Sequence, residues 1–254
     1  MHRSCGRVAA IVLAMALLGA CGSSSTPRAQ GEPTTTAAAA APTTAAPATP
    51  PTVAPTPADP ALTRAGAAGQ AVVVTADRYG TTTAMLTAYE RDGAGGWRRV
   101  FGPWSARVGT RGLAPPEEKR EGDGRTPSGV YGVDFFFGVA PDPGVRFPYR
   151  RVTGKSIVWD DDPASPLYNT WVDLDRQQSG AEPEPMYVTP AYDHGAVIAY
   201  NTARTPGLGS AIFLHVSNGG PTAGCVSLPA GQLVEVLRWL DPARAPRIVL
   251  GVAG

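Results

Sequence analysis

His215 and Cys225 lie ten residues apart in the stretch FLHVSNGGPTAGCVSLP, residues 213–229. A cysteine attacks carbonyl groups as its thiolate, and a neighbouring imidazole can supply the base that takes the thiol proton. Three glycines and a proline stand between the two residues, so the chain can fold back and bring the cysteine beside the histidine. The pair therefore predicts nucleophilic thiol chemistry.

Two simpler interpretations stay open for these side chains. A histidine at the end of an apolar strand can be a satisfied core residue, and a cysteine among strand-forming residues can be a buried, inert thiol. In the catalytic interpretation, Gly224 lets the backbone approach a bound carbonyl closely. The N–H groups of Gly224 and Cys225 could then form an oxyanion hole.

Short β-like runs separated by glycine and proline must position this pair. In AIFLHVS, alternation places Phe213 and His215 on one face of a strand and Ile212, Leu214 and Val216 on the other. The expected strands are residues 71–75, 83–90, 97–102, 129–138, 156–160, 195–201, 211–217 and 247–252.

One segment has the spacing of a helix. Over residues 229–242, Pro229 suits the first turn and Pro242 ends the helix. Apolar residues recur there at i, i+3, i+4 and i+7: Leu233, Val236, Leu237 and Leu240. Many strands and one helix predict a mostly β, sandwich-like or barrel-like fold with one clear helix near the C-terminus. The Pro- and Asp-rich stretch 139–194 is expected to form long loops over a site.

The first residues predict export from the cytoplasm. Arg3 and Arg7 begin the chain, and Val8 to Leu18 form an apolar run of 11 residues. A membrane-spanning helix needs about 20 residues, so this run suits a signal-peptide core. LGAC, residues 18–21, resembles a bacterial lipobox, in which the sulfur of Cys21 is lipidated. An ordinary signal peptide with a chance cysteine is the alternative.

The segment after Cys21 is rich in Pro, Thr and Ala, most strongly over residues 33–60. Such a composition buries little apolar surface and predicts an extended tether. We expect a signal peptide over 1–20, a lipidated tether over 21–70 and one folded domain over 71–254. The domain would then lie at the extracytoplasmic face of the bacterial cell membrane. The net charge of +1, without a basic block, argues against nucleic acid as a partner, and we expect a monomer.

HVSNGGPTAGCVSL resembles the active-site signature of the YkuD-type L,D-transpeptidases. That signature is a histidine on a strand, a glycine-containing loop and then Ser/Thr-His-Gly-Cys. EGDGRTPSGVYGV, residues 121–133, resembles the family's upstream Gly-x-x-Thr-Pro-x-Gly block, and residues 197–215 resemble the strand pair that leads to the histidine. The resemblance covers nearly all of residues 71–252.

The resemblance implies an activity on peptidoglycan stem peptides. Cys225 would attack the carbonyl that precedes the terminal D-Ala, form a thioester and release D-Ala. An amine on another stem would resolve the thioester into a cross-link, or water would resolve it as in an L,D-carboxypeptidase. His215 would take the thiol proton, and a backbone carbonyl of Val216 or Ser217 would orient the imidazole. The family needs no metal and no other cofactor.

Two positions depart from the family pattern. Ala223 stands where the family usually has histidine, and Ser227 stands where it often has arginine or asparagine. The lost groups normally help to hold substrate or acceptor. A catalytically inactive peptidoglycan-binding module is therefore a third possibility.

Several further residues are candidates for substrate binding. His194 is a candidate to replace the missing imidazole in space, and Arg125 could meet a stem-peptide carboxylate. The alternatives are a surface-loop histidine and a solvated turn arginine. The complete set of candidates is Thr222, Asn218, His194, Tyr200 and Arg125.

The run Asp160-Asp161-Asp162 could bind a cation, but consecutive acidic residues in a loop seldom all face one point. The turn Gly122–Arg125 lacks the strand–loop–helix order of a phosphate loop. We therefore expect no metal site.

Overall fold

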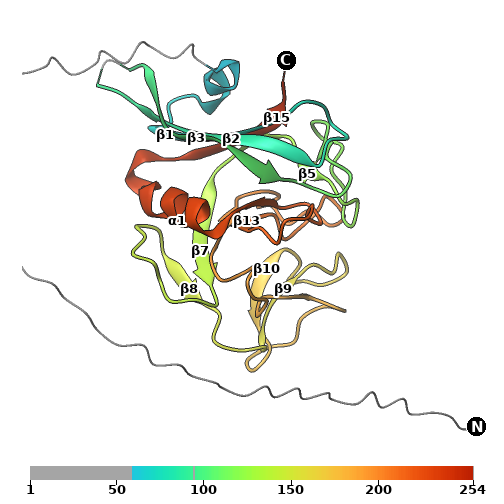
Figure 1. Cartoon of the computed structure of the whole chain (residues 1–254). Helices are drawn as coiled ribbons and strands as arrows, with labels where there is room; N and C mark the ends of the chain where they lie inside the picture. The colour runs from blue at the N-terminus through green and yellow to red at the C-terminus, as the bar shows by residue number, and fades with distance from the viewer. Residues whose placement is uncertain (1–58, 94, 254) are drawn as a thin grey trace, which may run out of the picture. The chain divides into compact units, whose positions relative to one another are not determined.

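The computed structural model describes residues 59–93 and 95–253 of the chain (Figure 1). The expected signal peptide, Cys21 and most of the expected tether lie outside these residues. Most of the regular secondary structure in the described part is strand, with one α-helix near its C-terminal end, which confirms the expected fold class. No helix within it is long and apolar enough to span a membrane.

The elements follow one another from an initial 3₁₀ helix to a final strand. The strands are β1 (Gln70–Ala76), β2 (Thr83–Arg91), β3 (Trp97–Arg107), β4 (Leu113–Ala114), β5 (Thr126–Pro127), β6 (Gly129–Tyr131), β7 (Val133–Gly138), β8 (Tyr149–Arg151), β9 (Ile157–Asp160), β10 (Thr170–Asp173), β11 (Glu184–Pro185), β12 (Gly195–Ile198), β13 (Phe213–Val216), β14 (Val226–Leu228) and β15 (Arg247–Val252). The helices are η1 (Pro60–Ala65), α1 (Ala230–Trp239) and η2 (Pro242–Arg244).

All eight expected strands are present; β15 has the expected bounds, and the bounds of the other seven differ. The run 129–138 forms two strands rather than one, since β6 pairs with β15 while β7 pairs with β12 and β8. The expected strand 195–201 ends at Ile198, where the Tyr200 N–H donates to the Ile198 carbonyl at 2.6 Å and turns the chain. The helix ends at Trp239, before Pro242.

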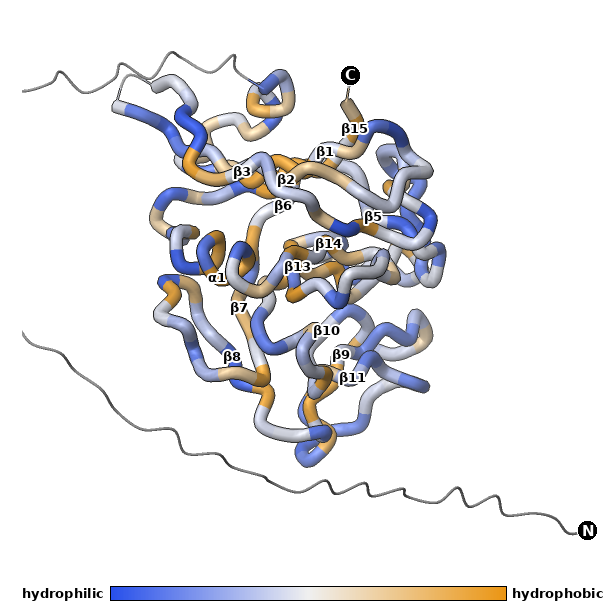
Figure 2. The backbone as a smooth tube through the Cα atoms, viewed as in Figure 1, coloured by the Kyte–Doolittle hydropathy of each residue, from blue (hydrophilic) through white to orange (hydrophobic). Residues whose placement is uncertain are grey.

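A ten-stranded sheet forms the centre of the domain, in the order β6-β15-β1-β2-β3-β14-β13-β12-β7-β8. Most neighbours are antiparallel, whereas β1/β15, β7/β8 and β13/β14 are parallel pairs. Hydrophobic stretches follow β1 and β13 in Figure 2, and many of the connecting loops are hydrophilic.

The largest core lies between this sheet and helix α1. Leu233, Val236 and Leu237 of α1 are fully buried and belong to the same cluster as Leu214 and Val216 of β13. The periodicity in the sequence therefore identified the buried face of the helix correctly. Burial of this apolar stripe, rather than intrinsic helix propensity, is what stabilises a ten-residue helix.

A second, aromatic core lies on the other side of β13. Phe213 packs edge-on against Phe137, Trp159 and Tyr192, with ring centroids 5.1–5.8 Å apart. Cys225 belongs to this cluster. Phe213 and Leu214 thus lie in opposite cores, as the expected alternation requires.

The stretch 139–194 is more structured than expected. It contains β8 and a three-stranded sheet in the order β10-β9-β11. Asp160, at the end of β9, is fully buried and accepts hydrogen bonds from the Ser165 hydroxyl at 2.7 Å and the Gly180 N–H at 2.7 Å. These bonds satisfy a buried carboxylate and fold the loops that follow.

The folded part begins before residue 71. Helix η1, within the expected tether, buries Leu62 and Ala65 against Val73 and Val249 of the sheet. The Asp59 carboxylate caps it by accepting from the Ala61 N–H at 2.9 Å. The described residues before 71 therefore include a helix that packs on the sheet and the first residue of β1.

Candidate active site

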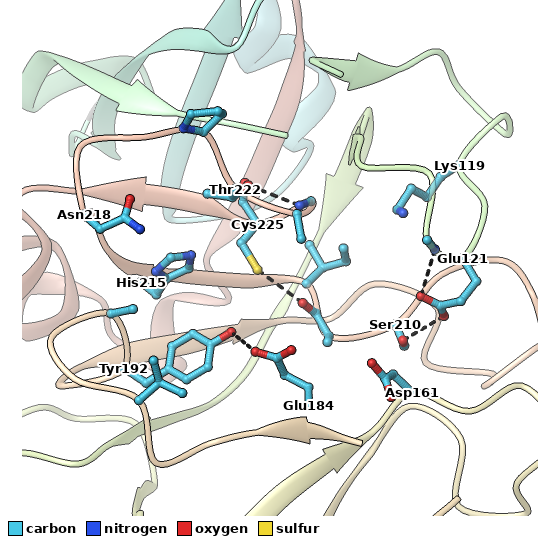
Figure 3. A pocket seen from close by; sticks show the side chains of 18 residues that line it. Lys119, Glu121, Asp161, Glu184, Tyr192, Ser210, His215, Asn218, Thr222 and Cys225 are labelled. Carbon is cyan, nitrogen blue, oxygen red and sulfur yellow. Dashed lines mark hydrogen bonds between the residues drawn. The ribbon is translucent and has the colours of Figure 1, made fainter. Parts of the chain in front are cut away.

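A cavity of about 390 Å³ opens beside the ends of β13 and β14 (Figure 3). Cys225 and His215 both line it, together with Thr222, Asn218 and Gly224. The structure therefore brings together the expected nucleophile, the expected base and two of the five expected binding residues.

The parallel register of β13 and β14 explains why the two key side chains share one face. In the register of this pair, Leu214 is the partner of Val226 and His215 is the partner of Ser227. Residues that are paired in register on two neighbouring strands point to the same side of the sheet, and side chains alternate in direction along each strand. Cys225, which precedes Val226, therefore lies on the His215 side of the sheet.

The Cys225 thiol is buried and fully hydrogen-bonded. It donates to the Ala211 carbonyl oxygen at 3.2 Å, and its sulfur accepts from the Phe213 N–H at 3.3 Å. Among the described residues, it makes no hydrogen bond to His215. Burial raises the pKa of the Cys225 thiol to about 12, since a thiolate would be poorly solvated there. The thiol is therefore protonated at neutral pH in this arrangement.

His215 is held in the tautomer that a base needs. Its Nδ1 lies 2.9 Å from the Val216 carbonyl oxygen, and a carbonyl can only accept, so Nδ1 carries the proton. The basic lone pair is then on Nε2. Of the two carbonyls considered in the sequence, Val216 is the one in contact. Burial lowers the pKa of His215, while hydrogen bonding to the carbonyls of Val216 and Ala191 acts in the opposite direction.

The ring of Tyr192 packs against the imidazole of His215. Its ring meets that of His215 edge to face, with centroids 5.4 Å apart and an interplanar angle of 85°. Its hydroxyl donates to Glu184 Oε1 at 2.9 Å. Nothing in the sequence marks Tyr192 and Glu184, because Tyr192 lies in the irregular segment before β12 and Glu184 in the two-residue strand β11.

The loop that carries Cys225 is fixed by hydroxyl groups. The Cys225 carbonyl accepts from Thr222 Oγ1 at 2.7 Å and from Thr126 Oγ1 at 3.1 Å. The Gly224 N–H donates to Thr222 Oγ1 at 3.2 Å, so this N–H is occupied in the absence of substrate. Its role in an oxyanion hole remains a prediction. A Cβ at Gly224 would lie 3.1 Å from the Arg125 carbonyl oxygen, which leaves little space for a larger residue.

Three carboxylates that the sequence did not single out as binding residues also line the cavity: Glu121, Asp161 and Glu184. Burial and the nearby Glu121 and Glu184 raise the pKa of Asp161 to about 6. Burial also raises the pKa of Glu184. None of the three forms an ion pair with a described Lys, Arg or His side chain.

The Asp160–Asp162 run does not converge on one point. Asp160 accepts hydrogen bonds from Ser165 and Gly180, and Asp162 accepts hydrogen bonds from the backbone N–H groups of Ala164 and Ala181. Of the three, only Asp161 lines the cavity. Within the described residues, no group of three or more His, Cys, Asp or Glu side chains is arranged to hold a metal ion.

The remaining three candidates are not among the residues that line this cavity. His194 Nδ1 lies 3.1 Å from the Tyr149 hydroxyl. The Tyr200 hydroxyl donates to the Leu208 carbonyl at 2.5 Å, and the Arg125 N–H donates to Asp123 Oδ1 at 2.8 Å. The cation that does line the cavity is Lys119.

Comparison with known families identifies the domain that contains this cavity. The family model of the YkuD L,D-transpeptidase catalytic domain matches residues 71–249, which contain every residue of the cavity. Neither curated proteins nor solved structures gave a match to the chain. With about 70% of its residues inside the matched range, the chain belongs to the YkuD L,D-transpeptidase family.

Proposed function

We propose that this protein is a cysteine-dependent L,D-transpeptidase that cross-links peptidoglycan stem peptides and releases D-Ala. The observation that carries the proposal is the placement of Cys225 and His215 on one sheet face, lining one cavity. A nucleophile and a base in one pocket are the minimum set for acyl transfer through a thioester.

The first step makes the thioester. The thiol turns from the Ala211 carbonyl toward His215, whose Nε2 takes the proton as the sulfur attacks the carbonyl before D-Ala. The new C–S bond forms, the C–N bond breaks, and the proton passes from the imidazolium to the departing amine of D-Ala. The D-Ala leaves as a neutral amine, and the acyl group stays on the sulfur.

The second step consumes the thioester. An amine of another stem attacks the acyl carbon, the C–S bond breaks as the amide cross-link forms, and the proton of the amine returns through His215 to the sulfur. Asp161 and Glu184 favour an amine, because unpaired carboxylates in a cavity attract an ammonium group. Water as acceptor, which gives an L,D-carboxypeptidase, is the alternative outcome of the same chemistry.

The two departures from the family pattern affect different places. Ala223 lines the cavity, so the missing imidazole leaves open space beside the nucleophile. Ser227 is buried at 1% exposure, and its hydroxyl has no hydrogen-bond partner among the described residues. Neither change removes Cys225 or His215, so we rank an inactive binding module behind an enzyme.

Mass spectrometry of a reaction with a disaccharide-tetrapeptide tests the proposal. The purified protein should release D-Ala and form a cross-linked dimer, and both products should disappear in Cys225→Ala and His215→Ala. Free tripeptide in place of dimer would identify a carboxypeptidase. No turnover, combined with wall binding that Cys225→Ala leaves intact, would identify a binding module.

We further propose that Cys21 anchors the domain by lipid to the extracytoplasmic face of the bacterial membrane. The motif LGAC and the Pro/Thr/Ala-rich segment after it support this location. Metabolic labelling with an alkyne-tagged fatty acid should mark the wild-type protein and not Cys21→Ala. Labelling that is equal in both would refute the anchor.

A further inference from the structure

We propose that Lys119 binds the free carboxylate at the C-terminus of the donor peptide and thereby restricts the enzyme to a terminal peptide bond. This inference rests on the proposed function, since it assigns a residue to the carboxylate of the departing D-Ala. Among the residues that line the cavity, Lys119 is the single lysine or arginine.

Lys119 is a buried cation with one hydrogen-bond donor left over. Its exposed fraction is 5%, and its Nζ donates to Asp123 Oδ1 at 2.6 Å and to the Arg120 carbonyl at 2.6 Å. An ammonium group has three N–H donors. The described residues use two of them, so the third remains for a ligand.

The position of Lys119 suits the leaving group. In Figure 3, Lys119 and His215 lie on opposite sides of Cys225. Burial and Glu184 raise the pKa of the Cys225 thiol, whereas the Phe213 N–H and the charge of Lys119 act in the opposite direction. A peptide whose scissile carbonyl sits at the sulfur can then direct its last residue toward the ammonium while His215 handles the proton.

The other charged residues of the cavity disfavour a carboxylate at any place except beside Lys119. Asp161 and Glu184 repel a carboxylate, so a carboxylate has one favourable place in the cavity. Glu121, near Lys119 in Figure 3, is occupied by hydrogen bonds from the hydroxyls of Tyr168 and Ser210. Ser227, where the family often has arginine, is buried, does not line the cavity and carries no charge.

The competing explanation is purely structural. Lys119 and Asp123 form an ion pair within one loop, and Asp123 also accepts from the backbone of Arg120 and Arg125. If the pair only fixes this loop, removing either partner should have the same effect. If Lys119 binds a carboxylate, Asp123→Asn keeps the Lys119 cation, so this variant should still prefer a donor that ends in a free carboxylate.

Two matched donors measure the preference directly: a tetrapeptide stem ending in D-Ala and the same stem ending in D-alaninamide. Wild-type protein should prefer the acid by about 10- to 100-fold in kcat/KM, as expected for a charge-assisted hydrogen bond. The ratio should fall toward 1 in Lys119→Gln and survive in Lys119→Arg and Asp123→Asn. Lys155→Gln removes the other, exposed lysine of the chain and should leave the ratio unchanged.

Binding of both peptides to Cys225→Ala, measured by calorimetry, separates this inference from the proposed function. Preference for the acid without any turnover in the wild type would support Lys119 and refute the transpeptidase. Equal use and equal binding of acid and amide by the wild type would overturn the carboxylate site, whether or not Lys119→Gln folds. Equal losses in Lys119→Gln and Asp123→Asn would show a loop-fixing role alone.

Discussion

The Cys225 sulfur lies 3.2 Å from the Ala211 carbonyl oxygen, to which its thiol donates. Ala211 has a φ of 52°, a left-handed conformation that is costly for a residue with a Cβ. The Asn169 side chain accepts from the Ala211 N–H at 3.2 Å and helps to hold it. The local backbone therefore holds the Cys225 thiol in its neutral form in the described structure.

This resting state has a measurable pH dependence. Because burial raises the pKa of Cys225 to about 12, the thiolate fraction in the free protein is small at pH 7 and grows about tenfold per pH unit up to that value. Alkylation by iodoacetamide should therefore be slower than for a free cysteine at pH 7 and should rise steadily between pH 7 and 10. Mass spectrometry of intact protein follows the rate, with Cys225→Ala as the unreactive control.

A plateau in the alkylation rate near pH 7 would contradict this prediction. It would mean that the thiolate–imidazolium pair already exists without substrate. His215→Ala distinguishes the two cases, because it would lower the rate strongly only if the imidazole already holds the thiol proton.

Thr126 links the upstream sequence block to the nucleophile. It is fully buried, donates to the Cys225 carbonyl at 3.1 Å and accepts from the Gly109 N–H at 2.9 Å. Thr126→Val removes both bonds and should cost about 1–3 kcal/mol of unfolding free energy. Turnover should fall about tenfold or more, because the cysteine loop loses a contact that fixes its position.

Thr126→Ser is the matched control, since it keeps the hydroxyl and loses one methyl group. Thermal unfolding and kcat/KM should both stay near the wild-type values in this variant. If Thr126→Val stays near the wild type while Thr126→Ser loses stability and activity, packing rather than hydrogen bonding explains the role of this residue.

Tyr192 positions His215 through its ring and through Glu184. Tyr192→Phe keeps the edge-to-face contact at 5.4 Å and loses the hydroxyl that donates to Glu184, so kcat should fall only a few-fold. Tyr192→Leu removes the ring, and kcat should fall about tenfold or more with a smaller change in KM. Single-turnover release of D-Ala measures the difference. Equal kcat values for the Phe and Leu variants would rule out the ring as a support.

The sequence predicted that His215 and Cys225 come together, because local rules govern their placement. Strand alternation fixes the face of His215, and a glycine-rich return loop brings Cys225 beside the same strand. Periodicity likewise identified Leu233, Val236 and Leu237 as the buried stripe of α1. Each of these features depends on residues close together in the chain.

The rest of the cavity depends on contacts between distant segments. Lys119 and Asp161 come from two separate loops and Glu184 from the short strand β11, and no period or motif connects the three. Arg125 illustrates the difficulty, since it is only six residues from Lys119 and yet does not line the cavity. Which charged side chain of a loop faces inward is decided by tertiary packing, and composition alone cannot reveal it.

The raised pKa of Asp161 predicts how the acidic residues of the cavity affect the stability of the fold at different pH values. Its folded pKa of about 6 lies above the ordinary value of 3.8, because burial and the neighbouring Glu121 and Glu184 disfavour the charged form. The folded state therefore binds this proton more tightly than the unfolded state does. Above pH 6 the charged carboxylate destabilises the fold, and this penalty disappears as the pH falls through 6 toward 3.8.

Asp161→Asn should thus stabilise the protein at pH 7.5, by about 1 kcal/mol after allowance for partial solvent screening. For a domain of this size, that corresponds to a rise in Tm of about 2–4 °C. The gain in stability should shrink below pH 6 and vanish near pH 4, as thermal unfolding at a series of pH values would show.

Asp162→Asn is the control. Asp162 has a lowered pKa, because it accepts from the Ala181 and Ala164 N–H groups, so its substitution should not stabilise the fold at pH 7.5. A gain for Asp161→Asn that is constant from pH 4 to 7.5 would show that charge repulsion in the cavity is not its cause.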